Sequence, residues 1–137
     1  LGSRGLGDVY KRQAAACSQR SISNWVSKCM TTDIGYYFNM DQIKADPWNS
    51  PEKMWQHSPL KYANMAKTPT LFIQSDEDYR CWMGDAIQMF SALKYFGVEA
   101  RMCLFHGENH ELSRSGKPKH RIRRMTEMME WFEKYLK

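Results

Sequence analysis

The sequence predicts an α/β fold with a parallel sheet, and residues 68–111 carry most of that prediction. This stretch reads as a strand at residues 70–74, an acidic loop, a helix at about residues 84–96, a strand at residues 100–105 and a loop that contains a histidine. The order strand, helix, strand favours parallel pairing through a right-handed crossover. Ligands of such sheets bind outside the carboxyl ends of the strands, so the acidic loop and the histidine loop predict a site there.

The elements before this stretch are less regular. Residues 14–18 are small and mostly apolar, which is typical of a short buried parallel strand. Residues 26–67 are rich in aromatic side chains without a clean period, and we expect them to pack over the sheet rather than form a domain of their own. Within them, Ser50 followed by Pro51 predicts the start of a short helix that ends near Gln56.

Two longer helices have apolar residues at helical spacing. In the first, the expected core face comprises Ile87, Phe90, Leu93 and Phe96, with Ala86 and Met89 beside them. Gly97 then predicts the C-terminal cap of that helix. The last helix is expected at residues 118–136, with a core face of Ile122, Met125, Met129, Phe132 and Leu136.

Composition excludes several classes of protein. The chain has 137 residues, which fits one domain or part of a larger one, and 42% hydrophobic residues argue against intrinsic disorder. Much of the net charge of +5 lies in residues 117–124, at the start of the last helix. No reader motif or interleaved aromatic residues accompany this basic run, so we expect no nucleic-acid partner. No run of 18 apolar residues occurs, so we expect no membrane span.

The cysteines and histidines predict neither a disulfide framework nor a metal site. Cys17 and Cys103 lie in strand-like runs and are expected to be buried free thiols, which favours a reducing, cytoplasmic location. The spacing Cys103-x-x-His106-x-x-x-His110 superficially suggests zinc. Strand residues alternate between the faces of a sheet and no fourth ligand is evident, so we expect no metal and no cofactor.

Asp78 and His110 are the candidate catalytic residues, because each follows a predicted strand. Adjacent parallel strands lie ~4.8 Å apart, so loops from their ends can bring a carboxylate to an imidazole. An aspartate that accepts a hydrogen bond from one ring nitrogen fixes the tautomer and leaves the other nitrogen as a general base. Spacing alone favours the simpler explanation, a solvated acidic loop and a histidine that bonds to its own backbone.

The identities around both residues add a family resemblance. The strings that carry it are 19–25 (QRSISNW), 33–35 (DIG), 58–62 (SPLKY), 68–71 (TPTL), 76–81 (DEDYRC) and 105–118 (FHGENHELSRSGKP). In these strings the chain resembles serine peptidases of the prolyl oligopeptidase family, on the acylaminoacyl-peptidase-like branch. The resemblance covers residues 14–137 and implies the C-terminal portion of an α/β-hydrolase catalytic domain that acts on short peptides. It also implies that Asp78 is the acid and His110 the base of a Ser, Asp, His triad, with Asp76 and Glu77 as the nearest alternative acids.

The serine nucleophile of such a triad has no candidate in the chain, because no Gly-x-Ser-x-Gly elbow occurs. Ser3 has the wrong glycine spacing, and Ser113 and Ser115 follow the histidine without an elbow. We therefore expect this chain alone to hydrolyse nothing measurable. A non-catalytic α/β binding module and an esterase with the same triad remain open as alternatives.

Three further expectations concern the ends and the departures from the family pattern. Residues 1–13 lack any periodicity and resemble a translated sequencing adapter, so we interpret them as a scar that is not native. Trp82 and His106 stand where the family usually has proline. The strand at residues 14–18 is expected to lack a neighbour on one side, and its free edge should promote association; the full-length protein could form oligomers.

Overall fold

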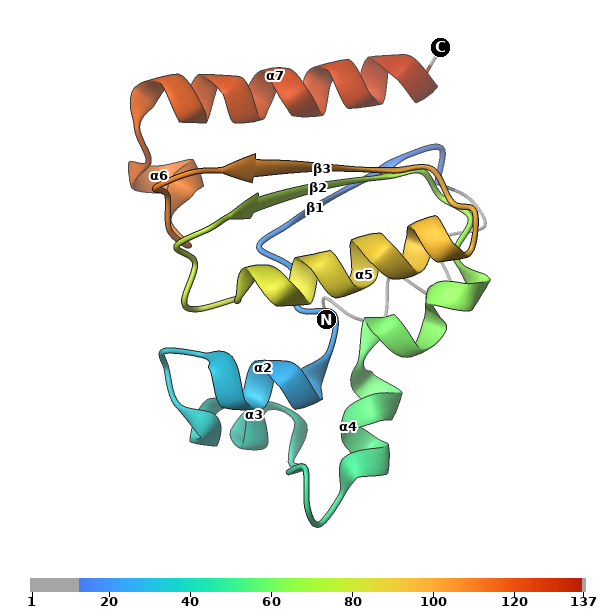
Figure 1. Cartoon of the computed structure of the whole chain (residues 1–137), viewed down its shortest axis with the longest axis vertical. Helices are drawn as coiled ribbons and strands as arrows, with labels where there is room; N and C mark the ends of the chain where they lie inside the picture. Colours follow the sequence, from blue (N-terminus) through green and yellow to red (C-terminus); the bar gives the residue numbers. More distant parts are fainter. Residues whose placement is uncertain (1–12, 137) are drawn as a thin grey trace.

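The computed structural model of the chain describes residues 13–136, so all but one residue of the interpreted scar lies outside the described part. Its centre is a three-stranded parallel sheet in the order β1-β2-β3. The strands are β1 (Ala16–Gln19), β2 (Thr70–Ser75) and β3 (Ala100–Phe105). The register places Cys17 beside Leu71 and Ile73 beside Cys103. Three parallel strands with flanking helices confirm the fold class that the sequence predicts (Figure 1).

Strand β2 is the core of the molecule because helices cover both of its faces. All six of its residues are buried, as expected for a central parallel strand. Leu71 and Ile73 pack toward α7 (Pro118–Tyr135), whereas Phe72 packs toward α5 (Met83–Tyr95) on the opposite face (Figure 1). The expected cap of α5 is confirmed, since Gly97 has a φ of +74°.

The predicted buried faces of both long helices are partly wrong. In α5 the fully buried apolar residues are Ala86, Met89 and Leu93, while Ile87 and Phe96 are exposed. In α7 the residues that pack into the core are Met128, Trp131, Phe132 and Tyr135. The stripe of Ile122, Met125, Met129 and Leu136 is exposed instead. Each helix carries more apolar residues than one face can bury, and spacing alone does not say which of two adjacent faces meets the sheet.

The segment between β1 and β2 differs from the expectation of a simple cover over the sheet. It forms α2 (Trp25–Thr31), α3 (Tyr36–Ile43), α4 (Pro51–His57) and the 3₁₀ helix η1 (Pro59–Met65). Helices α2, α3 and α4 enclose a small core of their own, made of Cys29, Ile43, Ala45 and Met54. The end of this segment contributes to the core beneath the sheet through Ala63 of η1 and Ala66 directly after it. Helix α4 begins at Pro51 and ends at His57, close to the predicted bounds.

Two smaller observations complete the fold. All four cysteines are free; Cys29 and Cys81 are buried, whereas Cys17 and Cys103 are only half-buried, contrary to expectation. A short helix, α6 (Leu112–Ser115), links the loop after β3 to α7 and was not predicted. Within residues 13–136, no helix combines the length and the apolar character needed to cross a membrane.

Candidate functional site

The loops that leave β2 and β3 are bonded to each other beyond the end of the sheet. The amide of Asp76 donates to the carbonyl of Phe105 at 3.3 Å, and the amide of Glu77 donates to the carbonyl of Glu108 at 3.1 Å. These contacts continue the β2–β3 pairing past the last residues of both strands. Backbone hydrogen bonds therefore fix the two loops relative to each other independently of their side chains.

Asp78 is held by groups from its own part of the chain. Its side chain is 1% exposed, and Oδ1 accepts hydrogen bonds from the amides of Arg80 at 3.0 Å and Cys81 at 2.8 Å. An aspartate that accepts bonds from amides two and three residues later forms a local turn. Gln74 Nε2 donates to Oδ2 at 3.3 Å and to the carbonyl of Cys81 at 2.8 Å. The carboxylate is thus oriented by the sequence immediately around it.

His110 meets this carboxylate from the neighbouring loop. Its Nδ1 lies 2.9 Å from Asp78 Oδ2 and 3.1 Å from Oδ1, and its side chain is 23% exposed. A carboxylate only accepts hydrogen bonds, so Nδ1 carries the proton and Nε2 of the neutral ring is left with a free lone pair. No hydrogen-bond partner of Nε2 occurs among residues 13–136. The pair has the arrangement that general-base chemistry needs, and the predicted proximity of Asp78 and His110 is confirmed.

The two nearest alternative acids do not contact His110. Asp76 accepts a hydrogen bond from the amide of Gly107 at 2.8 Å and forms a second carboxylate–imidazole pair with His106. The hydrogen bond from His106 lowers the pKa of Asp76 against the opposing effect of burial. His106 itself is 96% exposed. Glu77 is exposed and joins the loop contacts only through its amide.

A third carboxylate–imidazole pair fixes the histidine loop to α7. Glu108 is 5% exposed, and its Oε1 accepts hydrogen bonds from the amide of Lys117 at 3.0 Å and from His120 Nδ1 at 2.6 Å. Burial raises the pKa of Glu108, but the hydrogen bonds from His120 and Lys117 outweigh it and the pKa is lowered overall. The loop that carries His110 is therefore attached to the first turn of the last helix.

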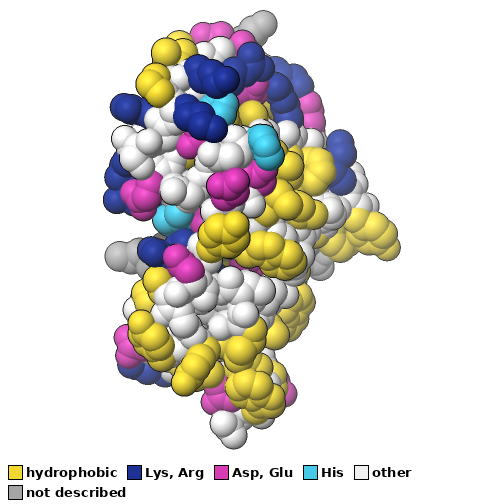
Figure 2. Space-filling model, turned by 60° about the vertical axis from the view of Figure 1, so that its left-hand side comes forward, with side chains coloured by type: hydrophobic (Ala, Val, Ile, Leu, Met, Phe, Trp, Pro, Cys, Tyr) yellow, Lys and Arg dark blue, Asp and Glu magenta, His cyan; other side chains and the backbone are white. Residues whose placement is uncertain are grey.

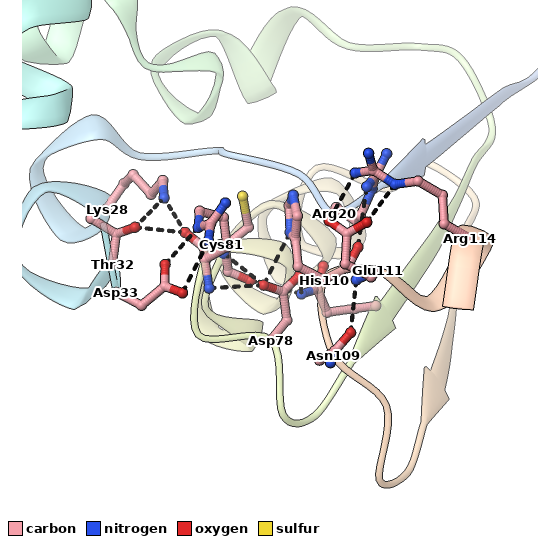
Figure 3. A network of polar contacts seen from close by, with 12 residues as sticks. Arg20, Lys28, Thr32, Asp33, Asp78, Cys81, Asn109, His110, Glu111 and Arg114 are labelled. Carbon is pink, nitrogen blue, oxygen red and sulfur yellow. Dashed lines mark hydrogen bonds and ion pairs between the residues drawn. The ribbon is translucent and has the colours of Figure 1, made fainter. Parts of the chain in front are cut away.

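Helix α2 and the residues that follow it hold the acidic loop on the side away from the histidine loop (Figure 3). The carbonyl of Arg80 accepts hydrogen bonds from Lys28 Nζ and from Thr32 Oγ1, the latter at 3.0 Å. The Arg80 guanidinium pairs with Asp33 at 2.6 Å, and this hydrogen bond lowers the pKa of Asp33. Lys28 is 1% exposed, and burial lowers the pKa of its ammonium group. The turn that orients Asp78 is thus secured at its backbone carbonyls as well as at its amides.

Sequence reasoning did not identify the residues that support the pair. Gln74 carries a usable signal, because its amide side chain follows the apolar residues 71–73 directly and lies next to the last residue of β2, close to the acidic loop. Lys28 and Glu108 carry none, since Lys28 contacts Arg80, 52 residues later, and Glu108 contacts Lys117 and His120 only because the chain turns through α6. Among residues 13–136, no group of three or more histidine, cysteine or acidic residues could hold a metal ion.

The surface around the pair is divided by chemical type. Figure 2 presents the face onto which the strands open, turned forward from the left of Figure 1. Histidine and acidic side chains lie together in its middle, Lys and Arg gather above them, and hydrophobic side chains cover much of the part below. Exposed aromatic residues of the helical segment and of the acidic loop include Tyr36, Tyr37, Tyr79 and Trp82.

Comparison with known proteins identifies the family of the chain. The sequence profile of the prolyl oligopeptidase family matches residues 6–137. An uncharacterized peptidase of Bacillus subtilis, YuxL, is 43% identical over 125 residues, which cover 91% of this chain and 19% of that protein. The acylamino-acid-releasing enzyme of Arabidopsis thaliana is 28% identical over 139 residues, 96% of this chain and 18% of the enzyme.

A solved structure of a peptidase is also similar to this chain in fold. The acylaminoacyl peptidase of Pyrococcus horikoshii superposes with a TM-score of 0.87 at 34% identity, over 94% of this chain and 22% of the peptidase. The chain therefore spans only about a fifth of the length of these relatives. The profile match covers nearly the whole chain, and the chain belongs to the prolyl oligopeptidase family.

Proposed function

We propose that this chain is the C-terminal portion of a serine peptidase catalytic domain and supplies the base and the acid of its Ser-His-Asp triad. The observation that carries the proposal is the hydrogen bond of 2.9 Å between His110 Nδ1 and Asp78 Oδ2. A buried carboxylate in this position orients the ring and stabilises the imidazolium that forms during catalysis. Family membership supports the assignment, because the two residues lie in the strings that resemble the family most closely.

The reaction gives the two ring nitrogens different roles: Nε2 transfers protons, and Nδ1 keeps its proton. His110 Nε2 removes the proton from a serine hydroxyl as the serine oxygen attacks the carbonyl carbon of a peptide bond. The same nitrogen then gives this proton to the departing amine, which leaves an acyl-enzyme ester. Water, deprotonated by Nε2, attacks the ester and releases the acid, and the serine recovers its proton. Asp78 stays ionised throughout and keeps Nδ1 protonated.

The serine would come from a part of the longer protein that this sequence does not contain. The chain has no Gly-x-Ser-x-Gly elbow. Ser113 and Ser115 lie on α6, and neither makes a hydrogen bond to His110 in the described part of the chain. The oxyanion hole would also come from elsewhere, since it includes the amide of the residue after the nucleophile.

Relatives suggest the class of substrate. Several are named for releasing acylamino acids or dipeptides, so we propose short peptides as substrates of the parent enzyme. The four free cysteines agree with a reducing environment, and we propose a cytoplasmic location and no cofactor.

The test uses the full-length reading frame from which the chain derives. A serine-reactive fluorophosphonate should label the full-length protein at an upstream serine and should leave the 137-residue chain unlabelled. In the full-length enzyme, Asp78→Asn should lower kcat by about 10⁴-fold and His110→Gln by about 10⁶-fold on peptide substrates. The matched controls Asp76→Asn and His106→Gln alter the neighbouring pair and should change kcat only a few-fold.

Either of two results contradicts the proposal. If the Asp76→Asn and His106→Gln variants lose as much kcat as the Asp78→Asn and His110→Gln variants, disruption of the loops rather than loss of proton transfer explains the effect. A full-length protein with no serine elbow and no fluorophosphonate labelling would instead indicate a non-catalytic binding module.

A further inference from the structure

Arg20 has a backbone conformation that its surroundings must maintain. It follows β1 directly and has a φ of +52°, in the left-handed region that side chains other than glycine and asparagine rarely adopt. Among residues 13–136, the other non-glycine residue with positive φ is Lys44, at +49°. Lys44 caps the C-terminus of α3, where a left-handed residue is common, whereas Arg20 follows a strand. Strained residues of this kind persist where several contacts hold them and are frequent at functional sites.

The contacts of Arg20 lead to the candidate base. Its amide donates to the carbonyl of Ile73 at 3.2 Å and so continues the pairing of β1 with β2. Its guanidinium Nη1 donates to the carbonyl of His110 at 3.1 Å, 90 residues later in the chain. Strand β2 lies between β1 and β3, so the side chain reaches across the end of the central strand to the histidine loop. Figure 3 shows Arg20 next to His110 within the polar network, which extends from Lys28 at one end to Arg114 at the other.

We propose that Arg20 is a positioning residue for His110, an inference that rests on the proposed function. The imidazole is bonded to Asp78 through Nδ1, while the main chain of the same residue is bonded to Arg20 through its carbonyl oxygen. These two contacts lie on opposite sides of the His110 Cα–Cβ bond and together limit rotation of the ring relative to the loop. The left-handed backbone at Arg20 turns the side chain out of the sheet and toward His110.

Neighbouring charged groups do not replace this contact. Glu111, the next residue in the loop, is paired with Arg114 at 2.5 Å. Glu108 and His120 hold the loop on its α7 side, two residues before His110. The carbonyl of His110 has Arg20 as its side-chain donor in the described part of the chain. Loss of one charge-assisted hydrogen bond should raise the open population of the loop about tenfold.

The experiment uses the chain itself, labelled with ¹⁵N-histidine, and follows the His110 Hδ1 proton by NMR. Asp78→Ala identifies the resonance by removing its acceptor. Arg20→Gly and Arg20→Asn both fit a left-handed backbone and both delete the guanidinium. We expect exchange of the Hδ1 proton with water to become about tenfold faster in both variants. Relief of strain should offset the lost hydrogen bond, so the melting temperature should stay within about 3 °C of the unmodified chain.

Lys44→Gly is the matched control, because it relieves the same kind of strain in an exposed cap far from the loop. It should leave the exchange rate unchanged. Unchanged exchange in the Arg20 variants overturns the inference. So does faster exchange accompanied by a fall in melting temperature beyond that range, which indicates a structural role only. If the unmodified chain has no Asp78-dependent resonance, the acid–base pair and the proposed function fail as well.

Discussion

Asp85 offers a quantitative test of the way α5 is anchored next to the acidic loop. This aspartate lies in the first turn of α5 and is 0% exposed. Its Oδ1 accepts a hydrogen bond from Ser27 Oγ at 2.5 Å, whereas Oδ2 has no partner in the described part of the chain. Burial raises the pKa of Asp85 from 3.8 to about 6, against the opposing effects of Ser27 and the Lys28 charge.

The size and sign of the effect follow from this shift. An acid whose pKa is raised in the folded state binds its proton more tightly when folded, so stability falls as pH rises from 3.8 to about 6. Above that pH range Asp85 is ionised in the folded chain, so the full desolvation free energy of the buried carboxylate opposes folding. At 1.36 kcal/mol per pKa unit, the cost added between about pH 4 and pH 8 is roughly 2–3 kcal/mol. Asn at this position does not titrate and therefore avoids it.

Urea unfolding of Asp85→Asn and of the unmodified chain, followed by tryptophan fluorescence from pH 4 to pH 8, measures this difference. The difference in the free energy of unfolding, variant minus unmodified chain, should increase by roughly 2–3 kcal/mol between pH 4 and pH 8. A constant offset from burying the new amide does not affect this gain. Ser27→Ala, which removes the bond that lowers the pKa of Asp85, should extend the loss of stability to higher pH. A stability difference that is independent of pH, or that reverses sign, would refute the reasoning.

Three further predictions concern other groups. Glu108→Ala should lower the free energy of unfolding by about 2–3 kcal/mol at pH 7, because it removes two hydrogen bonds to a buried carboxylate, from the Lys117 amide and His120 Nδ1. Since the pKa of Glu108 is lowered by its hydrogen bonds, this contribution should be lost as pH falls below the ordinary glutamate range, as urea titrations at several pH values can check. Burial raises the pKa of the Cys81 thiol to about 11, so alkylation of Cys81, followed by mass spectrometry, should be slow at pH 8 and accelerate toward pH 11. The chain should associate as its concentration rises, because an apolar groove of about 720 Å³ lies open along α7. Met129→Lys places a charge in this groove and should weaken the association in sedimentation experiments. An unmodified chain that stays monomeric at high concentration would contradict this prediction.

The acid–base pair was accessible from the sequence because local rules determine it. A strand followed by an aspartate and the next strand followed by a histidine are enough to predict that the two side chains share one edge of a parallel sheet. The turn at Asp78 is closed by the amides of Arg80 and Cys81, which follow it closely in the chain. The choice of Asp78 over Asp76 came from the family resemblance, and spacing alone would have allowed either.

The buried faces of the helices were less accessible. The exposed stripe of α7 and its buried stripe are both apolar and lie side by side on the same helix. Periodicity identifies that such a helix is amphipathic, but the orientation is set by how Trp131 fits beside Leu71 and Ile73. Helices α2 and α3 were missed because they have seven and eight residues, too few for a period to emerge. Asn24 does supply a cap to the amide of Val26, a signal that could have indicated α2.

The two members of the pair differ in how far their support extends through the chain. Asp78 is oriented by Gln74, Arg80 and Cys81, all within four residues of it. His110 depends on Arg20, 90 residues away, and its loop depends on the start of α7 through Glu108 and His120. A mutation that disturbs β1 or α7 should therefore displace the His110 ring, while the hydrogen bonds from the amides of Arg80 and Cys81 to Asp78 remain. The position of the His110 ring is thus set by tertiary contacts, whereas the Asp78 carboxylate is oriented by its sequence neighbours in a turn that Lys28 and Thr32 secure from α2.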